Sequence, residues 1–253
     1  MIHGILLWQA VFINMSTLLN DWNIEIDPIG RNNNELQRYG DKALKFNNSE
    51  LIISTIKNEH DILSGRINTR NKIEFQYGYI EILMKFPQGK GLWPAFWALG
   101  KDNKWPNCGE IDIMEWVGWN DKFIYGTLHG PNYYGGHPYS SGPLNILNKS
   151  LYNEYHKYSI EWKPDIIKWY IDDILYFTAT KNHLVNINKK YKWVFNNKYF
   201  YLILNMAVGG DFGGAFINSK NYIYHNLSNY NELNIKYIRI YKTVDNYGLI
   251  KRY

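Results

Sequence analysis

The sequence Trp105-Pro-Asn-Cys-Gly-Glu-Ile-Asp-Ile-Met-Glu-Trp116 places three acidic residues, Glu110, Asp112 and Glu115, in an otherwise apolar run of strand length. Carboxylates are rarely buried without a partner, and several on one strand add like-charge repulsion to the cost of desolvation. An exposed edge strand could also alternate acidic and apolar residues, but a purely structural strand would avoid these costs. The stretch therefore predicts a β-strand that carries a chemical site.

The spacing of the three acids predicts an irregularity in this strand. Residues two apart share a face, so Glu110 and Asp112 point the same way, whereas Glu115 would point to the opposite face of a regular strand. One extra residue near Met114, a β-bulge, shifts the pleat by one and returns Glu115 to the face of the other two acids. We therefore expect three carboxyl groups along one groove.

Three carboxyl groups in a groove fit the hydrolysis of a glycoside through a covalent intermediate. That reaction needs an ionised nucleophile and a protonated acid, with carboxyl groups roughly 5–5.5 Å apart when configuration is retained. Asp112 can share a proton with the nucleophile, and its charge favours protonation of a neighbouring acid near neutral pH. We expect the site to titrate as a coupled set.

The rest of the chain has the pattern of an all-β protein. Apolar runs of strand length recur throughout, separated by Gly, Pro, Asn and Asp, whereas helical periodicity is hard to find. Ten or more strands fit a two-sheet sandwich. No linker, repeat or break in composition is present, so residues 1–253 are expected to form a single domain. The predicted strands are 50–55, 73–86, 94–99, 110–116, 123–129, 155–162, 167–171, 174–178, 199–208 and 233–242, with a further strand in 5–13.

The connections between strands also carry predictions. Asp172 and Asp173 are expected to form the two-residue turn of a hairpin. Two long irregular stretches, 20–39 and 130–152, are rich in Gly, Asn, Pro and Tyr. Loops of this kind on a sheet scaffold usually shape a binding cleft.

Composition narrows the class of ligand. Aromatic residues make up 17% of the chain, with ten Trp and 22 Tyr, and flat amphipathic rings stack on sugars, although they also fill β cores. The net charge of +5 comes without a basic run, which argues against nucleic acid. The apolar stretch 5–13 is too short to span a membrane and lacks the flanks of a signal peptide. The single cysteine, Cys108, excludes an intramolecular disulfide and has no partner that marks it as a nucleophile.

The segment Glu110-Ile-Asp-Ile-Met-Glu115 resembles the signature of glycoside hydrolase family 16, in the bulged form found in its laminarinases. The resemblance implies a jelly-roll β-sandwich of the concanavalin A-like type, made of two curved antiparallel sheets with an open cleft on the concave face. An open cleft implies endo cleavage. Further matches run along nearly the whole chain: Leu7-Trp8, Trp22-Asn-Ile-Glu-Ile26, Asn33-Asn-Glu-Leu-Gln37, Ser64-Gly-Arg-Ile-Asn-Thr69, Gly89-Lys-Gly-Leu-Trp-Pro-Ala-Phe-Trp97, Tyr125-Gly-Thr-Leu-His129, Ile160-Glu-Trp162, Lys168-Trp-Tyr-Ile-Asp172 and Leu204-Asn-Met-Ala-Val-Gly-Gly210.

Catalytic roles follow from the resemblance. Glu110 takes the position of the nucleophile, Asp112 that of the assisting carboxylate and Glu115 that of the general acid/base, in agreement with the argument from the pleat. The implied reaction is the retaining endo-hydrolysis of 1,3-β-glucosidic linkages in laminarin-type glucan. No cofactor is required.

The resemblance also implies substrate-binding residues. Trp93, Trp97 and Trp116 resemble the aromatic walls of the sugar subsites, although any one of them could instead belong to the core. Trp105 and Trp119 flank the catalytic strand and raise the local aromatic density further.

Four polar residues resemble groups that hydrogen-bond the sugars: Asn34, Arg66, His129 and Asn205. Arg66 resembles a cation near the nucleophile that would hold a carboxylate ionised, or it is a surface cation. Asn34 could cap a loop, His129 could be a satisfied histidine, and Asn205 could pin a turn instead of lining the cleft.

Two departures from the family pattern bear on the site. Many relatives bind calcium away from the cleft through an acid in the first strand and an Asp before the last strand, where this chain has Ala10-Val11-Phe12 and Lys236. Calcium prefers several oxygen ligands, so we expect its site to be lost or filled by the Lys236 side chain, with no metal bound. The loop Gly210-Asp-Phe-Gly-Gly214 lacks a tryptophan often found there, which leaves one sugar subsite in doubt.

Two other functions remain open. The first is a non-catalytic glucan-binding protein, although relatives of that kind lose the acids that this chain keeps. The second is an endo-hydrolase or transglycosylase acting on mixed-linkage glucan or xyloglucan, but those enzymes tend to have one residue fewer between the last two acids. We expect a monomer whose partner is β-1,3-glucan, with neither nucleic acid nor membrane bound. The location of such substrates favours a secreted protein.

Overall fold

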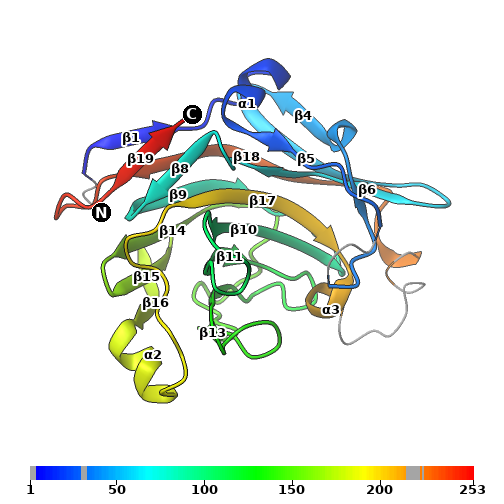
Figure 1. Ribbon diagram of the computed structural model, residues 1–253. Helices are drawn as coiled ribbons and strands as arrows, with labels where there is room; N and C mark the ends of the chain where they lie inside the picture. The colour runs from blue at the N-terminus through cyan, green and yellow to red at the C-terminus, as the bar shows by residue number, and fades with distance from the viewer. Residues whose placement is uncertain (1–3, 30–32, 215–222, 224) are drawn as a thin grey trace.

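The protein folds into two stacked β-sheets that bend in the same sense (Figure 1), in a computed structural model that describes residues 4–29, 33–214, 223 and 225–253. The ten-stranded sheet has the order β16-β15-β14-β9-β18-β5-β6-β3, with β1 on β18 and β4 on β5. The nine-stranded sheet has the order β13-β12-β11-β10-β17-β7-β2, with β8 on β17 and β19 on β8. All pairings between these strands are antiparallel except β3 with β6, which confirms the predicted jelly-roll sandwich.

The strands of the first sheet are β1 (Leu6–Gln9), β3 (Arg38–Tyr39), β4 (Leu44–Asn47), β5 (Glu50–Lys57), β6 (Ile62–Ser64), β9 (Gly78–Lys85), β14 (Tyr155–Lys163), β15 (Ile166–Ile171), β16 (Ile174–Thr180) and β18 (Tyr230–Tyr241). Those of the second are β2 (Asn23–Ile24), β7 (Arg66–Asn68), β8 (Ile73–Gln76), β10 (Leu92–Gly100), β11 (Glu110–Glu115), β12 (Tyr125–His129), β13 (Tyr139–Ser140), β17 (Phe200–Val208) and β19 (Leu249–Arg252).

The core lies between the sheets and follows from the alternation of side chains along each strand. In β9 the apolar side chains of Ile80, Ile82 and Met84 are fully buried in it. Many of the aromatic residues belong to this core, among them Trp162, whose ring forms T-shaped contacts with Phe75 and Phe200. The high aromatic content is therefore partly structural, as the alternative interpretation of the composition allowed.

One predicted strand, 73–86, is in fact two strands in different sheets. Its first part, β8, belongs to the nine-stranded sheet and its second, β9, to the ten-stranded sheet. Tyr77 and Gly78 have φ angles of 59° and 118°, so the backbone turns between them and crosses from one sheet to the other. A side chain at Gly78 would lie 2.7 Å from the carbonyl oxygen of Tyr241, which makes glycine necessary there.

The predicted hairpin is confirmed. Asp172 and Asp173 have φ angles of 47° and 67° and connect β15 to β16, as a type I′ turn requires.

Several short helices among the described residues were not predicted, including α1 (Met15–Asp21), α2 (Lys181–Ile187) and α3 (Gly210–Gly213). They have two turns or fewer, which is too short for apolar periodicity to reveal them. The strand expected in 5–13 covers only Leu6–Gln9, because Asn14 then caps α1 through a capping box with Thr17. Thr180 caps α2 in a similar way, by accepting the backbone N–H of His183.

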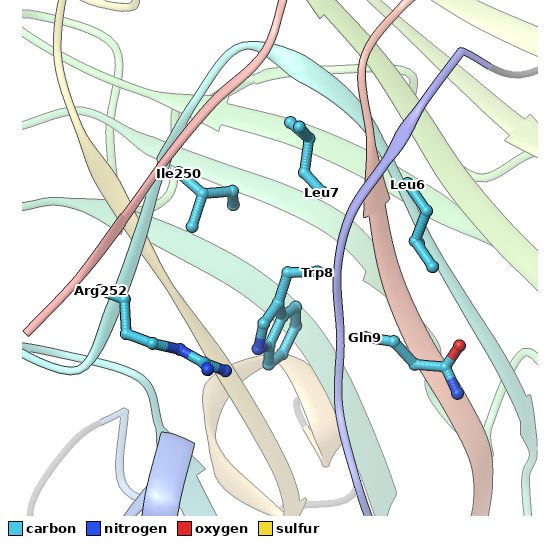
Figure 2. A pocket seen from close by; sticks show the side chains of 6 residues that line it. All are labelled: Leu6, Leu7, Trp8, Gln9, Ile250 and Arg252. Carbon is cyan, nitrogen blue, oxygen red and sulfur yellow. The ribbon is translucent and has the colours of Figure 1, made fainter.

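A pocket of about 470 Å³ lies at the edge of the sandwich, between β1 and β19. Figure 2 shows the side chains of Trp8 and Arg252 extending toward each other in this pocket, and both bind Asp21. None of the predicted site residues lines it, so it is not the site that the acids indicate. Within the described part of the chain, no helix is long and apolar enough to cross a membrane.

Candidate active site

The three acids lie on one face of β11 because of a bulge, as predicted. Asp112 faces Thr127 of β12 and Glu115 faces Tyr125, so two residues of β11 stand opposite one of β12. The two residues are Ile113 and Met114, and both side chains are buried in the core. The extra residue therefore turns Glu115 back to the outer face of the sheet, beside Glu110 and Asp112.

His129 completes the group of titratable side chains. It stands opposite Glu110 in the pairing of β11 with β12, and its Nε2 lies 3.3 Å from Oδ2 of Asp112. One nitrogen or oxygen from each of Glu110, Asp112 and His129 lies within 4.8 Å of the others. The structure thus brings the predicted histidine into direct contact with the acids.

Two indole N–H groups bind the outer acids. Trp105 donates to Oε2 of Glu110 at 2.6 Å, and Trp93 donates to Oε1 of Glu115 at 3.2 Å. Trp93 was predicted to be a wall of the site, but Trp105 was noted only for aromatic density. The sequence did not indicate this contact, because Trp105 lies in the loop between β10 and β11. The path of that loop, which brings its side chain to Glu110, cannot be read from residue spacing.

Burial raises the pKa of all three carboxyl groups. The pKa of Glu110 rises to about 8, first because of burial and then because of the charge of Asp112. The pKa of Glu115 rises to about 7 through burial, against the opposing effects of His129, Trp93 and Thr127. Burial and the charge of Glu115 also raise the pKa of Asp112 well above its usual range. The set therefore keeps protons at neutral pH, and a proton held by one carboxyl group lets a neighbour ionise.

This set should make the protein less stable as the pH rises. Between the ordinary value of 4.5 and about 8, the folded protein holds a proton within the set of Glu110, Asp112 and Glu115 that the unfolded chain has released, so the free energy of unfolding falls across this window. Glu110→Gln removes one carboxyl group of this set, and its melting temperature should exceed that of the wild type at pH 8 by more than at pH 5. Thermal melts at the two pH values measure the difference, and an equal difference at both would contradict the buried set.

The Glu115 end of the strand has an aromatic wall. Trp93 lies on the outer face of β10, with the ring of Phe212 5.4 Å away and edge-on. Phe212 also packs edge-on against Tyr125, at 5.0 Å. The loop that lacks the expected tryptophan thus supplies a phenylalanine ring at the site.

Trp97 and Asn205 lie on the same face of the sheet and bind each other. The indole N–H of Trp97 donates to Oδ1 of Asn205 at 2.8 Å, and Trp97 stands opposite Asp112 in the pairing of β10 with β11. Asn205 is 5% exposed. Asn205 therefore fixes the ring of Trp97 by a hydrogen bond and does not stabilise a turn.

Arg66 does not lie beside Glu110 as expected, and its contact with the sugar stays a prediction. Its Nε lies 3.0 Å from Oε2 of Glu25, and its guanidinium stacks over the ring of Trp97 at 5.0 Å. In the described part of the chain, no contact joins it to Glu110. Two strands, β10 and β17, separate β7, which carries Arg66, from Glu110 on β11. Arg66 therefore pairs with the nearer carboxylate of Glu25.

Trp116 is also not a wall of the site. Its side chain is fully buried, stacks on Phe86 with ring centroids 5.0 Å apart, and donates to the carbonyl oxygen of Asp121. The bulge that turns Glu115 outward makes the next residue point inward, because side chains alternate along the strand.

A pair of tryptophan variants distinguishes wall from core. Trp116→Phe should lower the free energy of unfolding by about 2 kcal/mol, through a lost hydrogen bond and a small cavity, and should leave KM within about twofold. Trp93→Phe should raise KM and leave the free energy of unfolding nearly unchanged. Denaturant titration and steady-state kinetics test both, and a large rise in KM for Trp116→Phe would return that residue to the site.

Asn34 lies at the rim of the site. It is exposed, has a φ angle of 54°, and donates through Nδ2 to Oδ1 of Asp211 at 2.8 Å. It therefore anchors α3, which carries Phe212.

The Glu110 end of the site carries two exposed rings. Trp105 is 46% exposed, and Tyr134 is 47% exposed and packs edge-on against it at 5.2 Å. Tyr134 comes from the predicted irregular stretch 130–152. Large half-exposed rings beside a buried acidic group are typical of a ligand-binding surface.

Comparison with known proteins agrees with the family resemblance of the acidic strand. The model of the glycosyl hydrolases family 16 matches residues 31–222. A glucan endo-1,3-beta-glucosidase of Cryptopygus antarcticus is 32% identical over 235 residues, covering 84% of each chain, and a beta-glucanase of Rhodothermus marinus is 34% identical over 208 residues, covering 76% of this chain and 71% of the relative. The crystal structure of the laminarinase catalytic domain of Thermotoga maritima superposes with a TM-score of 0.83 at 35% identity, covering 96% of this chain and 100% of that one.

Proposed function

The chain belongs to family 16 of the glycosyl hydrolases, and from this membership we propose that it is a retaining endo-1,3-β-glucanase. It is a glycoside hydrolase that cleaves β-glucan internally. The observation that carries the finer proposal is the bulge at Ile113 and Met114, which puts Glu110, Asp112 and Glu115 on one face of β11.

The proposed reaction has two displacements. Glu110, ionised, attacks the anomeric carbon, and Glu115 gives its proton to the departing glycosidic oxygen, so that a glycosyl ester of Glu110 forms and the first sugar product leaves. Glu115 then takes a proton from water, which attacks the anomeric carbon and releases Glu110 as a carboxylate. Two inversions give net retention.

The neighbours of the acids support these roles. Donation from the Trp105 N–H and the electrostatic effect of His129 both favour the ionised form of Glu110, whereas burial and Asp112 raise its pKa. A proton held elsewhere in the coupled set lets Glu110 ionise for the attack. Burial keeps Glu115 protonated up to about pH 7, as a general acid requires. Trp93, Trp97 and Trp105 offer rings on which pyranose faces can stack.

Product stereochemistry and a substrate panel test the proposal. Purified enzyme is incubated with laminarin, mixed-linkage glucan and xyloglucan, and the anomeric protons of the products are followed by NMR from the first turnovers. We expect β-products and the highest kcat/KM on laminarin. First-formed α-products would refute retention, a preference for mixed-linkage glucan would favour the alternative substrate, and binding without cleavage would favour the binding-protein alternative.

We propose that the enzyme works without calcium at the place where many relatives bind it. The segments concerned, Ala10-Val11-Phe12 and Lys236, contain no carboxylate, and the Lys236 ammonium lies 4.0 Å above the ring of Tyr155. A strong chelator should shift the melting temperature by less than about 1 °C, and added calcium should not reverse any shift. A calcium-dependent rise of several degrees in the melting temperature would overturn this proposal.

Since its substrate lies outside most cells, we also propose that the enzyme acts outside the cell.

A further inference from the structure

A buried carboxylate outside the catalytic strand, that of Glu35, lies just before β3. Glu35 is 7% exposed, and its side chain accepts hydrogen bonds from Gln37 Nε2 at 2.6 Å and from the hydroxyl of Tyr39 at 3.1 Å. Its backbone also forms a bridge to Gly209, directly after β17. The catalytic cycle described above makes no use of this acid, and a buried carboxylate is costly to keep without a role.

Glu35 terminates a continuous chain of hydrogen bonds that begins at the site. Trp97 Nε1 donates to Oδ1 of Asn205 at 2.8 Å. Nδ2 of Asn205 donates to the hydroxyl oxygen of Tyr39 at 3.3 Å, and the Tyr39 hydroxyl donates to Glu35. The four side chains come from β10, β17, β3 and the segment before β3.

Every bond in this chain is fixed in direction by the chemistry of its members. An indole N–H can only donate, so the carbonyl of the Asn205 amide must face Trp97 and its NH₂ must face Tyr39. The Tyr39 hydroxyl then has to direct its proton to an acceptor, and an ionised carboxylate can only accept. Burial, together with the charge of Glu35, raises the pKa of Tyr39 well above its ordinary value, so the hydroxyl keeps its proton.

The ring at the start of the chain is also held from a second direction. The Arg66 guanidinium lies 5.0 Å from the ring centre of Trp97 and 5.9 Å from that of Tyr39, and Glu25 holds it by an ion pair. This cation contacts the rings but leaves the indole N–H without a partner. Asn205 alone supplies that partner among the described residues, and Tyr39 and Glu35 fix which way Asn205 points.

We propose that Glu35 is a positioning residue for substrate binding. Its charge orients Tyr39 and Asn205, and through them it holds the indole of Trp97, opposite Asp112, in the plane that a sugar stacks on. The proposal rests on the proposed function only in taking Trp97 as a contact of the glucan. In Glu35→Gln an amide NH₂ group can face the Tyr39 oxygen, so Tyr39 can direct its proton to the carbonyl of Asn205 instead. Asn205 then turns its NH₂ group toward the indole N–H of Trp97, which loses its acceptor.

A double-mutant cycle on laminarin tests the proposal. Glu35→Gln should raise KM about five- to tenfold and leave kcat within about twofold, and Tyr39→Phe should do the same. Trp97→Phe should raise KM at least as much. The double variant Glu35→Gln with Trp97→Phe should be no worse than Trp97→Phe alone, since both changes break the same chain.

Glu74 supplies a matched control. It is fully buried in β8 and accepts the hydroxyl of Tyr253 at 2.7 Å, but its described partners, Tyr253 and Lys101, lie outside the site. Glu74→Gln should therefore lower the melting temperature about as much as Glu35→Gln and leave KM unchanged. Equal rises in KM for the two variants, or additive losses in the double variant, would overturn the role of Glu35.

A measurement without substrate separates this inference from the proposed function. The indole ¹H–¹⁵N resonance of Trp97, assigned by its absence in Trp97→Phe, should move and exchange faster with solvent in Glu35→Gln and in Tyr39→Phe. It should remain in place in Glu74→Gln. An unchanged Trp97 resonance in folded Glu35→Gln would overturn the hydrogen-bond chain, whereas a moved resonance in a protein inactive on every glucan would refute the proposed function alone.

Discussion

Glu110→Gln is expected to lower kcat on laminarin by at least about 10⁴-fold, because the amide cannot form the glycosyl ester through which the reaction proceeds. The substitution is nearly isosteric, and the Trp105 N–H can still donate to the remaining amide oxygen. The variant should therefore fold and bind glucan with an affinity close to that of the wild type. Steady-state kinetics and calorimetric titration with a laminari-oligosaccharide measure the two quantities.

The same variant decides whether Glu110 or another acid is the nucleophile. Asp112→Asn serves as the comparison, because Asp112 adjoins both Glu110 and His129 but is assigned no covalent role. It should lose less activity than Glu110→Gln and should still release β-products. Substantial turnover by Glu110→Gln, with Asp112→Asn inactive, would move the covalent step to Asp112.

Glu115→Gln is expected to lower kcat on laminarin by about 10²–10⁴-fold, the usual contribution of general acid/base catalysis. The loss should be smaller for the formation of the glycosyl-enzyme from an aryl glucoside with an acidic phenol, because that leaving group departs without a proton. A burst of phenol followed by slow turnover would show that the glycosyl-enzyme forms and is then hydrolysed slowly, because no general base activates the water. Equal losses on both substrates would contradict the role of Glu115 as the acid.

The pH profile gives the same assignment independently. The pKa of Glu115 is raised to about 7, so its proton is present below that pH and is lost above it. In the wild type, kcat/KM should therefore fall as the pH rises past about 7. Glu115→Gln should flatten this limb, whereas Glu74→Gln should leave it in place. A limb that persists unchanged in Glu115→Gln would assign the titration to another group of the coupled set.

Local pattern was enough to predict the acidic strand and its bulge. Two acids separated by one residue share a face, and a third acid three residues further on can join them only through a bulge. The register of β11 against β12 has this bulge at Ile113 and Met114. The prediction succeeded because the period of a strand is set by its own backbone.

The same rule, applied one residue further, would have corrected the prediction for Trp116. If the bulge turns Glu115 outward, Trp116 must turn inward, and it is fully buried. The resemblance places Trp116 in an aromatic wall, whereas the alternation of side chains along the strand places it in the core. The turn at Tyr77 and Gly78 was missed for a different reason, because a continuous apolar run does not reveal that its two halves enter different sheets.

The sequence of residues 105–116 by itself thus determined an acidic strand with a bulge. It also determined that three carboxyl groups lie on one face of that strand. Which groups surround them depended on the tertiary structure: the Trp105 loop that returns to Glu110, the Phe212 ring brought to Trp93, and the capture of Arg66 by Glu25. Faces of a strand follow from a two-residue period along the chain, whereas a hydrogen bond between distant residues depends on which loops and strands the fold places within about 3 Å.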